Sequence, residues 1–176
     1  MSKKTTPRTT TQTVTIDSKR VRLVTRNGKV TVKAAPVLEI DLQIAAVREL
    51  KRLSEYVNDA DAVRPGTFTL AADQNGSGAR GRNAAVKLKA AGMAAGEPDV
   101  RLNFYGGVIR YVEFKGERGK LEESQERRFP LLRALGFEVA EIRAVSEQEA
   151  AEKAAALVRG WLVANDNLAP SAKKAA

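Results

Sequence analysis

A turn at residues 105–107, between two short apolar runs, constrains the fold of this chain more than any other feature. Residues 100–104 and 108–112 flank the turn with a binary pattern of polar and apolar side chains, which predicts an antiparallel hairpin. A two-residue loop would mix charged and apolar side chains on each face of this hairpin. A three-residue loop instead places Val100 opposite Val112 and keeps one face apolar. We therefore predict the three-residue loop, with its apolar face packed against a helix.

The same register gathers charged side chains on the other face of the hairpin. It places Asp99 directly opposite Glu113, with Lys115 two residues further along that face. Directly opposed side chains lie about 5 Å apart, so both carboxylates can reach one cation. Carboxylates this close repel each other unless positive charge lies between them. A solvated strand face with an ordinary mixture of charges is the alternative interpretation.

This face predicts metal-dependent hydrolysis of a phosphodiester. We expect Mg²⁺ or Mn²⁺ to be bound by Asp99, Glu113 and the backbone carbonyl of Phe114. The metal would lower the pKa of a bound water and neutralise charge on the phosphate. Lys115 would orient the nucleophile or stabilise it.

Composition narrows the chemistry further. The 176-residue chain holds no cysteine and no histidine, which excludes disulfide frameworks, zinc fingers, and catalysis by thiol or imidazole groups. Its net charge of +9 favours a polyanionic partner. No apolar run approaches the roughly 20 residues of a membrane span, and the N-terminus lacks the apolar core of a signal peptide. We therefore expect a cytoplasmic protein with no membrane partner.

The N-terminal segment carries most of the positive charge. Residues 1–35 hold nine lysines and arginines against Asp17 alone. We predict a disordered basic tail at 1–11 and a basic β-ribbon at 12–35, with Asn27-Gly28 as a hairpin turn. The ribbon is interpreted as an arm that binds DNA phosphates through Arg20, Arg22, Arg26 and Lys29. The alternatives are a solubilising lead-in or an edge ribbon that pairs with another protomer.

The remaining periodicities predict a mixed central sheet flanked by helices. Pro130 should kink its helix or mark a restart. Gly92 and Gly136 are expected to end helices, and a capping box at 146–149 should open the last one. The predicted elements are helices at 37–57, 83–91, 121–135 and 146–163, strands at 67–70 and 137–142, and a disordered tail at 165–176.

A glycine-rich basic stretch at residues 75–82 lacks the Gly-Lys-Ser/Thr ending of a phosphate-binding P-loop. We therefore expect no nucleotide cofactor. The stretch and the helix after it are instead expected to contact DNA, through Asn75, Arg80, Arg82 and Lys87.

Pro98-Asp99 and Glu113-Phe114-Lys115 resemble the signature of the PD-(D/E)XK nuclease superfamily. The wider pattern over about residues 37–150 resembles the VRR-Nuc family of virus-type replication-repair nucleases. The residues that carry this wider resemblance are Asn75, residues 87–92, 96–99 and 113–116, Leu121, Gln125 and Gly136.

The resemblance implies a restriction-endonuclease-like fold over residues 36–164. Asp99 and Glu113 match the metal ligands and Lys115 matches the catalytic lysine. Glu39 matches a glutamate of the first helix that completes the metal site, with Asp41 as its nearest competitor, and Gln125 matches a glutamine beside the site. Small stand-alone members of the family, often from phages, are homodimers that act on branched DNA such as four-way junctions, within a bacterial or phage-infected cell. A nuclease for ordinary duplex DNA and a non-catalytic DNA-binding protein with a nuclease-like fold are the alternatives.

Overall fold

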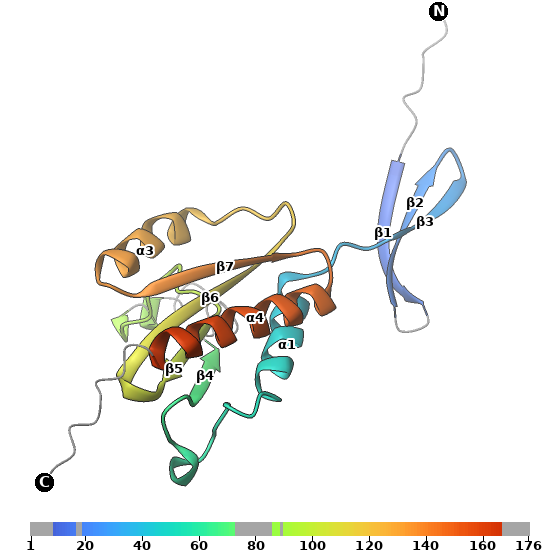
Figure 1. Cartoon of the computed structure of the whole chain (residues 1–176). Helices are drawn as coiled ribbons and strands as arrows, with labels where there is room; N and C mark the ends of the chain where they lie inside the picture. Colours follow the sequence, from blue (N-terminus) through green and yellow to red (C-terminus); the bar gives the residue numbers. More distant parts are fainter. Residues whose placement is uncertain (1–8, 17–18, 73–85, 89, 167–176) are drawn as a thin grey trace, which may run out of the picture. The chain divides into compact units, whose positions relative to one another are not determined.

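The computed structural model describes residues 9–16, 19–72, 86–88 and 90–166 of the chain (Figure 1). The chain divides into two compact units, with the boundary between Val37 and Leu38. The second unit contains both strands and helices, while the described part of the first holds strands. The protein is therefore of mixed α/β class. In the described residues, no helix is both long enough and apolar enough to cross a bilayer.

The first unit holds an antiparallel three-stranded sheet of β1 (Thr9–Ile16), β2 (Lys19–Arg26) and β3 (Lys29–Ala34). Asn27 and Gly28 have positive φ angles of 52° and 74°, which confirms the predicted two-residue turn between β2 and β3. The sheet begins earlier than predicted, because residues 9–11 belong to β1 and pair with residues 24–26. These three threonines are β-branched, which favours a strand. Residues 1–8 of the predicted tail lie outside the described residues.

The second unit is built on a mixed four-stranded sheet in the order β4-β5-β6-β7. Its first three strands are antiparallel, and β7 runs parallel to β6. The strands are β4 (Phe68–Ala72), β5 (Val100–Phe104), β6 (Val108–Gly116) and β7 (Glu138–Ala144).

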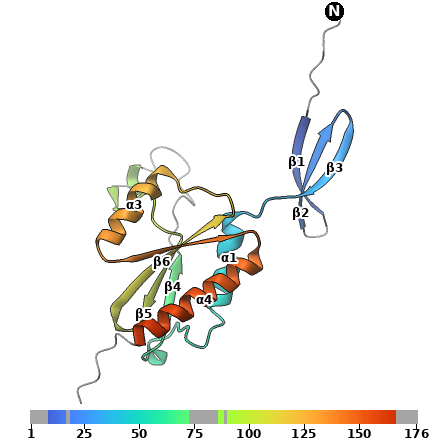
Figure 2. The same cartoon turned by 45° about the horizontal axis from the view of Figure 1, so that its top comes forward.

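Helices cover both faces of this sheet. The helices are α1 (Glu39–Leu50), α3 (Glu123–Ala134) and α4 (Glu147–Asp166), with short 3-10 turns at η1 (Ala60–Ala62) and η2 (Tyr105–Gly107). Figures 1 and 2 show α3 on one face and α1 with α4 on the other. On the α3 side, Phe129 and Leu132 pack against Tyr111 and Val139 of the sheet. On the α4 side, the Trp161 ring meets the Phe104 ring edge to face, so apolar side chains on both faces are buried.

The hairpin register follows the prediction. Phe104 pairs with Val108 and Val100 pairs with Val112 across β5 and β6. The loop is η2, whose Gly106 and Gly107 have φ angles of 81° and 80°. Because few side chains tolerate this left-handed region, two adjacent glycines suit the three-residue loop.

The first helix is shorter than its predicted range of 37–57. It ends at Leu50, and the chain beyond it pairs with β4 instead. Val57 N–H donates to the Phe68 carbonyl at 2.9 Å, and Phe68 N–H donates to the Glu55 carbonyl at 2.9 Å. Leu53 is still buried, so the helical spacing correctly indicated an apolar contact although the backbone is not helical there.

The other helices lie close to their predicted ranges. Pro130 lies inside α3, which is one helix from Glu123 to Ala134 rather than two. Gly92 and Gly136 have φ angles of 93° and 89°, as expected for residues that end helices. Residues 86–88 and 90 are helical within the predicted range of 83–91, and the rest of that range except Ala91 lies outside the described residues.

The last helix begins as predicted and ends later. Glu149 N–H donates to Ser146 Oγ at 3.2 Å, which is half of the predicted capping box. The Glu149 carboxylate accepts a hydrogen bond from Val145 N–H at 2.8 Å instead of bonding to Ser146 N–H. The helix continues to Asp166, so residues 165 and 166 of the predicted tail are helical, and residues 167–176 lie outside the described part of the chain.

Candidate active site

The C-terminal half of β6 carries charged side chains into the space beneath α3. Only 1% of Glu113, 5% of Lys115 and 8% of Gln125 is exposed to solvent. Glu113 and Lys115 alternate with Val112 and Phe114, whose side chains are buried on the opposite face. The alternative of a solvated strand face is therefore wrong for these residues. Burying charges in this way requires that each be paired.

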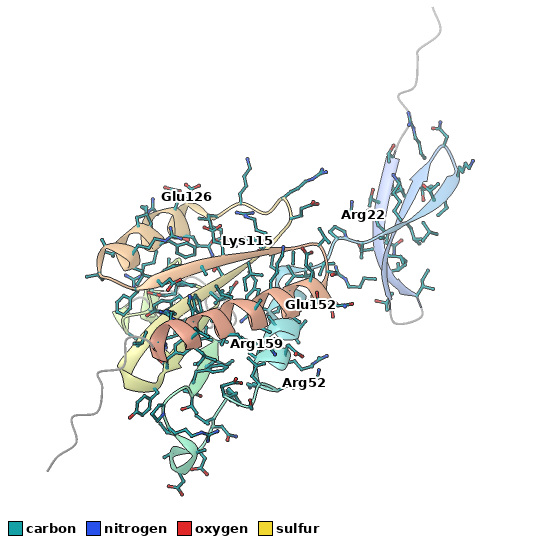
Figure 3. All side chains as sticks on the ribbon, viewed as in Figure 1. Arg22, Arg52, Lys115, Glu126, Glu152 and Arg159 are labelled. Atoms are coloured by element: carbon teal, nitrogen blue, oxygen red, sulfur yellow. The ribbon has the colours of Figure 1, made fainter. Side chains whose placement is uncertain are left out.

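Lys115, which is labelled in Figure 3, is paired with two carboxylates. Its Nζ lies 2.7 Å from Glu113 Oε1 and 3.3 Å from Glu39 Oε2. Burial alone would lower the pKa of Lys115, but hydrogen bonding and attraction to Glu113 and Glu39 leave that pKa raised. Lys115 is therefore an ammonium ion at neutral pH, which suits charge stabilisation and does not suit a general base.

Asp99 is joined to β6 by reciprocal hydrogen bonds. Asp99 N–H donates to Glu113 Oε2 at 3.2 Å, and Phe114 N–H donates to Asp99 Oδ2 at 2.8 Å. Since Val100 pairs with Val112, Asp99 lies beside Glu113 at the end of the hairpin, as predicted, and these side-chain bonds hold it there.

Both of these carboxyl groups favour protonation more than usual. Burial raises the pKa of Asp99, against the opposing effects of the Phe114 N–H and the Lys115 charge. Burial likewise raises the pKa of Glu113, and the neighbouring Asp99 charge raises it further, although Lys115 acts in the opposite direction. A positive charge placed beside Asp99 and Glu113 would favour their ionised forms and so lower both pKa values.

Glu39 reaches the site from the first turn of α1. Its Oε1 accepts a hydrogen bond from Gly116 N–H at 3.2 Å, while Oε2 contacts Lys115. Glu39 is therefore bonded to the end of β6. Gly119 makes room for it, because a Cβ there would lie 2.7 Å from Glu39 Oε1.

Gln125 bonds to the same oxygen of the Glu113 carboxylate that Lys115 contacts. Its Nε2 donates to Glu113 Oε1 at 2.6 Å, and its own Oε1 accepts from Glu122 N–H at 3.0 Å. The second bond belongs to the capping box that begins α3. Gln125 therefore links the start of a helix to a buried carboxylate, and we describe it as a positioning residue rather than a catalytic one.

Sequence reasoning missed two supports of the site. Gln43 Nε2 donates to the Asp99 carbonyl at 3.3 Å, and Arg128 forms an ion pair with Glu97. Gln43 lies four residues after Glu39 on α1, so helical spacing alone would have placed both on one face. No local pattern pointed to the pairing of Glu97 with α3.

The residues fit a hard divalent cation by the type of their donor atoms, because Asp99 and Glu113 offer carboxylate oxygens side by side. Among the described residues, no group of three or more carboxylates or other metal-binding side chains is close enough to hold an ion. Glu39 lies on the far side of Lys115, bonded to the ammonium group and to Gly116. Binding of metal by Asp99, Glu113, Glu39 and the Phe114 carbonyl remains a prediction.

The predicted DNA-binding residues fall into separate groups. Lys87 is exposed in the helical segment 86–88. Asn75, Arg80 and Arg82 lie outside the described residues. Arg20, Arg22, Arg26 and Lys29 all belong to the sheet of the first unit.

The geometry of the second unit thus supplies two adjacent acidic side chains, a buried ammonium group, and side chains that fix the orientation of both. Comparisons of the chain with protein-family models, with curated proteins and with solved structures found no match.

Proposed function

We propose that this protein is a divalent-metal-dependent endonuclease that hydrolyses phosphodiester bonds in DNA. The observation that carries the proposal is the buried pairing of Glu113 with Lys115, next to Asp99, at one end of β6. The resemblance of these residues to the PD-(D/E)XK signature, and of their surroundings to the VRR-Nuc family, supports the same activity. A mixed sheet with helices on both faces agrees with a restriction-endonuclease-like fold.

Asp99 and Glu113 would bind Mg²⁺ or Mn²⁺, with the Phe114 carbonyl and Glu39 completing the site. The bound metal would activate water and offset the charge that develops on the phosphate. Gln125 keeps the Glu113 carboxylate in one orientation through a 2.6 Å hydrogen bond. Glu39 and Glu113 hold the Lys115 ammonium between them, where it can orient the attacking water or stabilise the phosphate.

The substrate that we propose is branched DNA, in particular four-way junctions, cut by a homodimer in the cytoplasm of a bacterial or phage-infected cell. A dimer suits such a substrate because two coordinated cuts across a junction need two sites. This part of the proposal is supported by the family resemblance and by the basic composition of the chain.

Cleavage of four-way junction, flap and linear duplex DNA with Mg²⁺ or Mn²⁺ tests the activity. Asp99→Asn and Lys115→Ala should each lower the cleavage rate by about 100-fold or more, because the first weakens binding of the metal and the second removes a positive charge that stabilises the transition state. Asp61→Asn and Lys51→Ala make the same chemical changes at exposed positions, and cleavage should stay at the wild-type rate.

Two outcomes would contradict the proposal in different ways. If the wild-type protein binds DNA but never cuts it with either metal, it is a non-catalytic DNA-binding protein. If linear duplex is cut as fast as the junction, the protein is a nuclease for ordinary duplex and the preference for branches is wrong.

A further inference from the structure

The first unit has two chemically different faces. Side chains alternate between the faces of a strand, and residues paired across strands share a face. Arg22 on the central strand pairs with Thr13 on one side and with Lys33 on the other. Arg26 pairs with Thr9 and with Lys29. The register therefore gathers arginines, lysines and threonines on one face of the sheet.

We call this surface the basic face. It consists of Arg20, Arg22, Arg26, Lys29 and Lys33, together with Thr9, Thr11, Thr13, Thr15 and Thr31, and Val24 is the one apolar residue that the pairing places among them. The opposite face carries Val14, Val21, Leu23, Val30 and Val32. Because a shift of one residue in register would exchange the faces, the separation of charged and apolar side chains depends on this pairing.

The described strands of this sheet contribute no acidic side chain to the basic face. The segments Thr9–Ile16 and Lys19–Ala34 contain no aspartate and no glutamate. Lys29 and Lys33 on β3 are exposed, and so are Arg20 and Arg26 on β2. A surface of this kind raises the local concentration of polyanions.

We propose that the basic face binds the sugar-phosphate backbone of double-stranded DNA. Arginine and lysine contact phosphates by charge, and threonine hydroxyls add neutral hydrogen-bond donors of the kind found in phosphate contacts. The same strands contain no phenylalanine, tyrosine or tryptophan. Binding of single strands relies on such rings for base stacking, so duplex backbone is the better match.

The dimensions of the face agree with a duplex. Arg20 and Arg26 are six residues apart on β2, which corresponds to about 20 Å at roughly 3.3 Å per residue. A duplex rises about 3.4 Å per base pair, so this length corresponds to about six base-pair steps, and the phosphates on the side of the duplex that meets the sheet lie within its reach. The basic face can therefore neutralise several phosphates at once. The inference rests on the proposed function only in taking DNA as the substrate.

Binding of the full-length chain to a fluorescent DNA duplex, measured by anisotropy in EDTA over a range of KCl concentrations, tests the proposal. The variant Arg20→Gln/Arg22→Gln/Arg26→Gln should bind at least about 10-fold more weakly. Its slope of log affinity against log salt should fall by roughly 2 to 3, because each phosphate contact contributes about 0.9. The control Lys51→Gln/Arg52→Gln/Arg159→Gln removes the same charge from exposed positions of the second unit and should keep the wild-type slope. Arg52 and Arg159 are labelled in Figure 3.

Two more variants distinguish a loss of phosphate contacts from a loss of the folded sheet. Replacing the same three arginines with lysine should restore most of the slope, because charge is retained. Lys29→Gln/Lys33→Gln removes charge from the edge strand alone and should lower the slope by roughly 2.

The proposal is overturned if the arginine-to-glutamine variant keeps the wild-type slope, or if the control loses as much as that variant. It is also overturned if the basic face is needed for binding to phosphatidylserine vesicles and not to the duplex. Asp99→Asn should bind the duplex with the wild-type slope in EDTA. If this variant loses cleavage and keeps binding, the defect lies in the active site alone. The proposed endonuclease activity and the proposed duplex binding by the basic face can therefore fail independently.

Discussion

At the scale of single residues, the site depends on how one buried carboxylate is held. Glu113 accepts hydrogen bonds from Asp99 N–H and Gln125 and is paired with Lys115. Removing one partner of a buried charge strongly destabilises the folded protein. Each partner of Glu113 therefore affects both stability and the geometry available to a metal.

Gln125→Glu separates positioning of Glu113 from capping of α3. A glutamate can still accept the hydrogen bond from Glu122 N–H, but it has no N–H to donate to Glu113 and adds like charge beside it. We expect the metal affinity and the cleavage rate to fall by about 10- to 100-fold, while the helical content stays unchanged. Calorimetric titration with Mn²⁺, cleavage kinetics and circular dichroism provide the three readouts.

The matched control is Gln148→Glu on α4. Gln148 donates to Glu152 Oε1 at 2.9 Å, so this substitution also places a carboxylate beside a glutamate, but at the exposed surface. Solvent screens that repulsion, and cleavage should remain at the wild-type rate. Equal effects of the two substitutions would show that Gln125 does not act through Glu113.

At the scale of elements, the position of α3 relative to β6 decides whether Gln125 reaches its target. The segment before β5 approaches the start of this helix very closely at Gly96. Its φ angle is 83°, and a Cβ there would collide with the backbone of Ser124 and lie 2.8 Å from Gln125 N. The absence of a side chain at Gly96 therefore lets α3 lie against the site.

Gly96→Ala should lower the free energy of unfolding by more than the roughly 1–3 kcal/mol expected for a strained backbone alone. The control is Gly92→Ala, where φ is 93° but no atom lies within 4 Å of the position that a Cβ would take. Urea denaturation of both variants measures the difference. Equal losses of stability would mean that close contact with α3 is not what requires glycine at position 96.

At the scale of the whole molecule, the division of the chain after Val37 separates the basic sheet from the candidate active site. All of the residues bonded at that site, from Glu39 to Gln125, belong to the second unit. The second unit also contains the buried apolar residues of the core. We therefore expect it to fold and to perform the chemistry without the first unit.

Removal of residues 1–37 should leave a cooperative thermal transition and metal-dependent cleavage at low salt. At physiological salt the truncated protein should cleave much more slowly than the intact chain at the same low concentration, because it lacks the phosphate contacts of the basic face. Calorimetry and cleavage rates at two salt concentrations provide the measurements. Loss of the thermal transition would show that the second unit depends on the first for stability.

Much of the local structure could be predicted because it depends on neighbouring residues. The alternation around residues 105–107 determined the register, and the register placed Asp99 beside Glu113. Glycines with positive φ at positions 92 and 136 ended helices where expected. The range of α1 was wrong, because its last predicted turns hydrogen-bond to β4 instead, which no periodicity within the helix reveals.

The sequence by itself determined which residues carry charge, which alternate on one strand face, and which turns require glycine, since these properties follow from side-chain chemistry and local backbone geometry. Only the tertiary structure decided that Lys115 lies between Glu113 and Glu39, because Glu39 comes from a helix 76 residues earlier in the chain. It also decided that Gln125 bonds to Glu113. These contacts form when helices pack onto the sheet and exclude water, so they depend on the whole core rather than on any one segment.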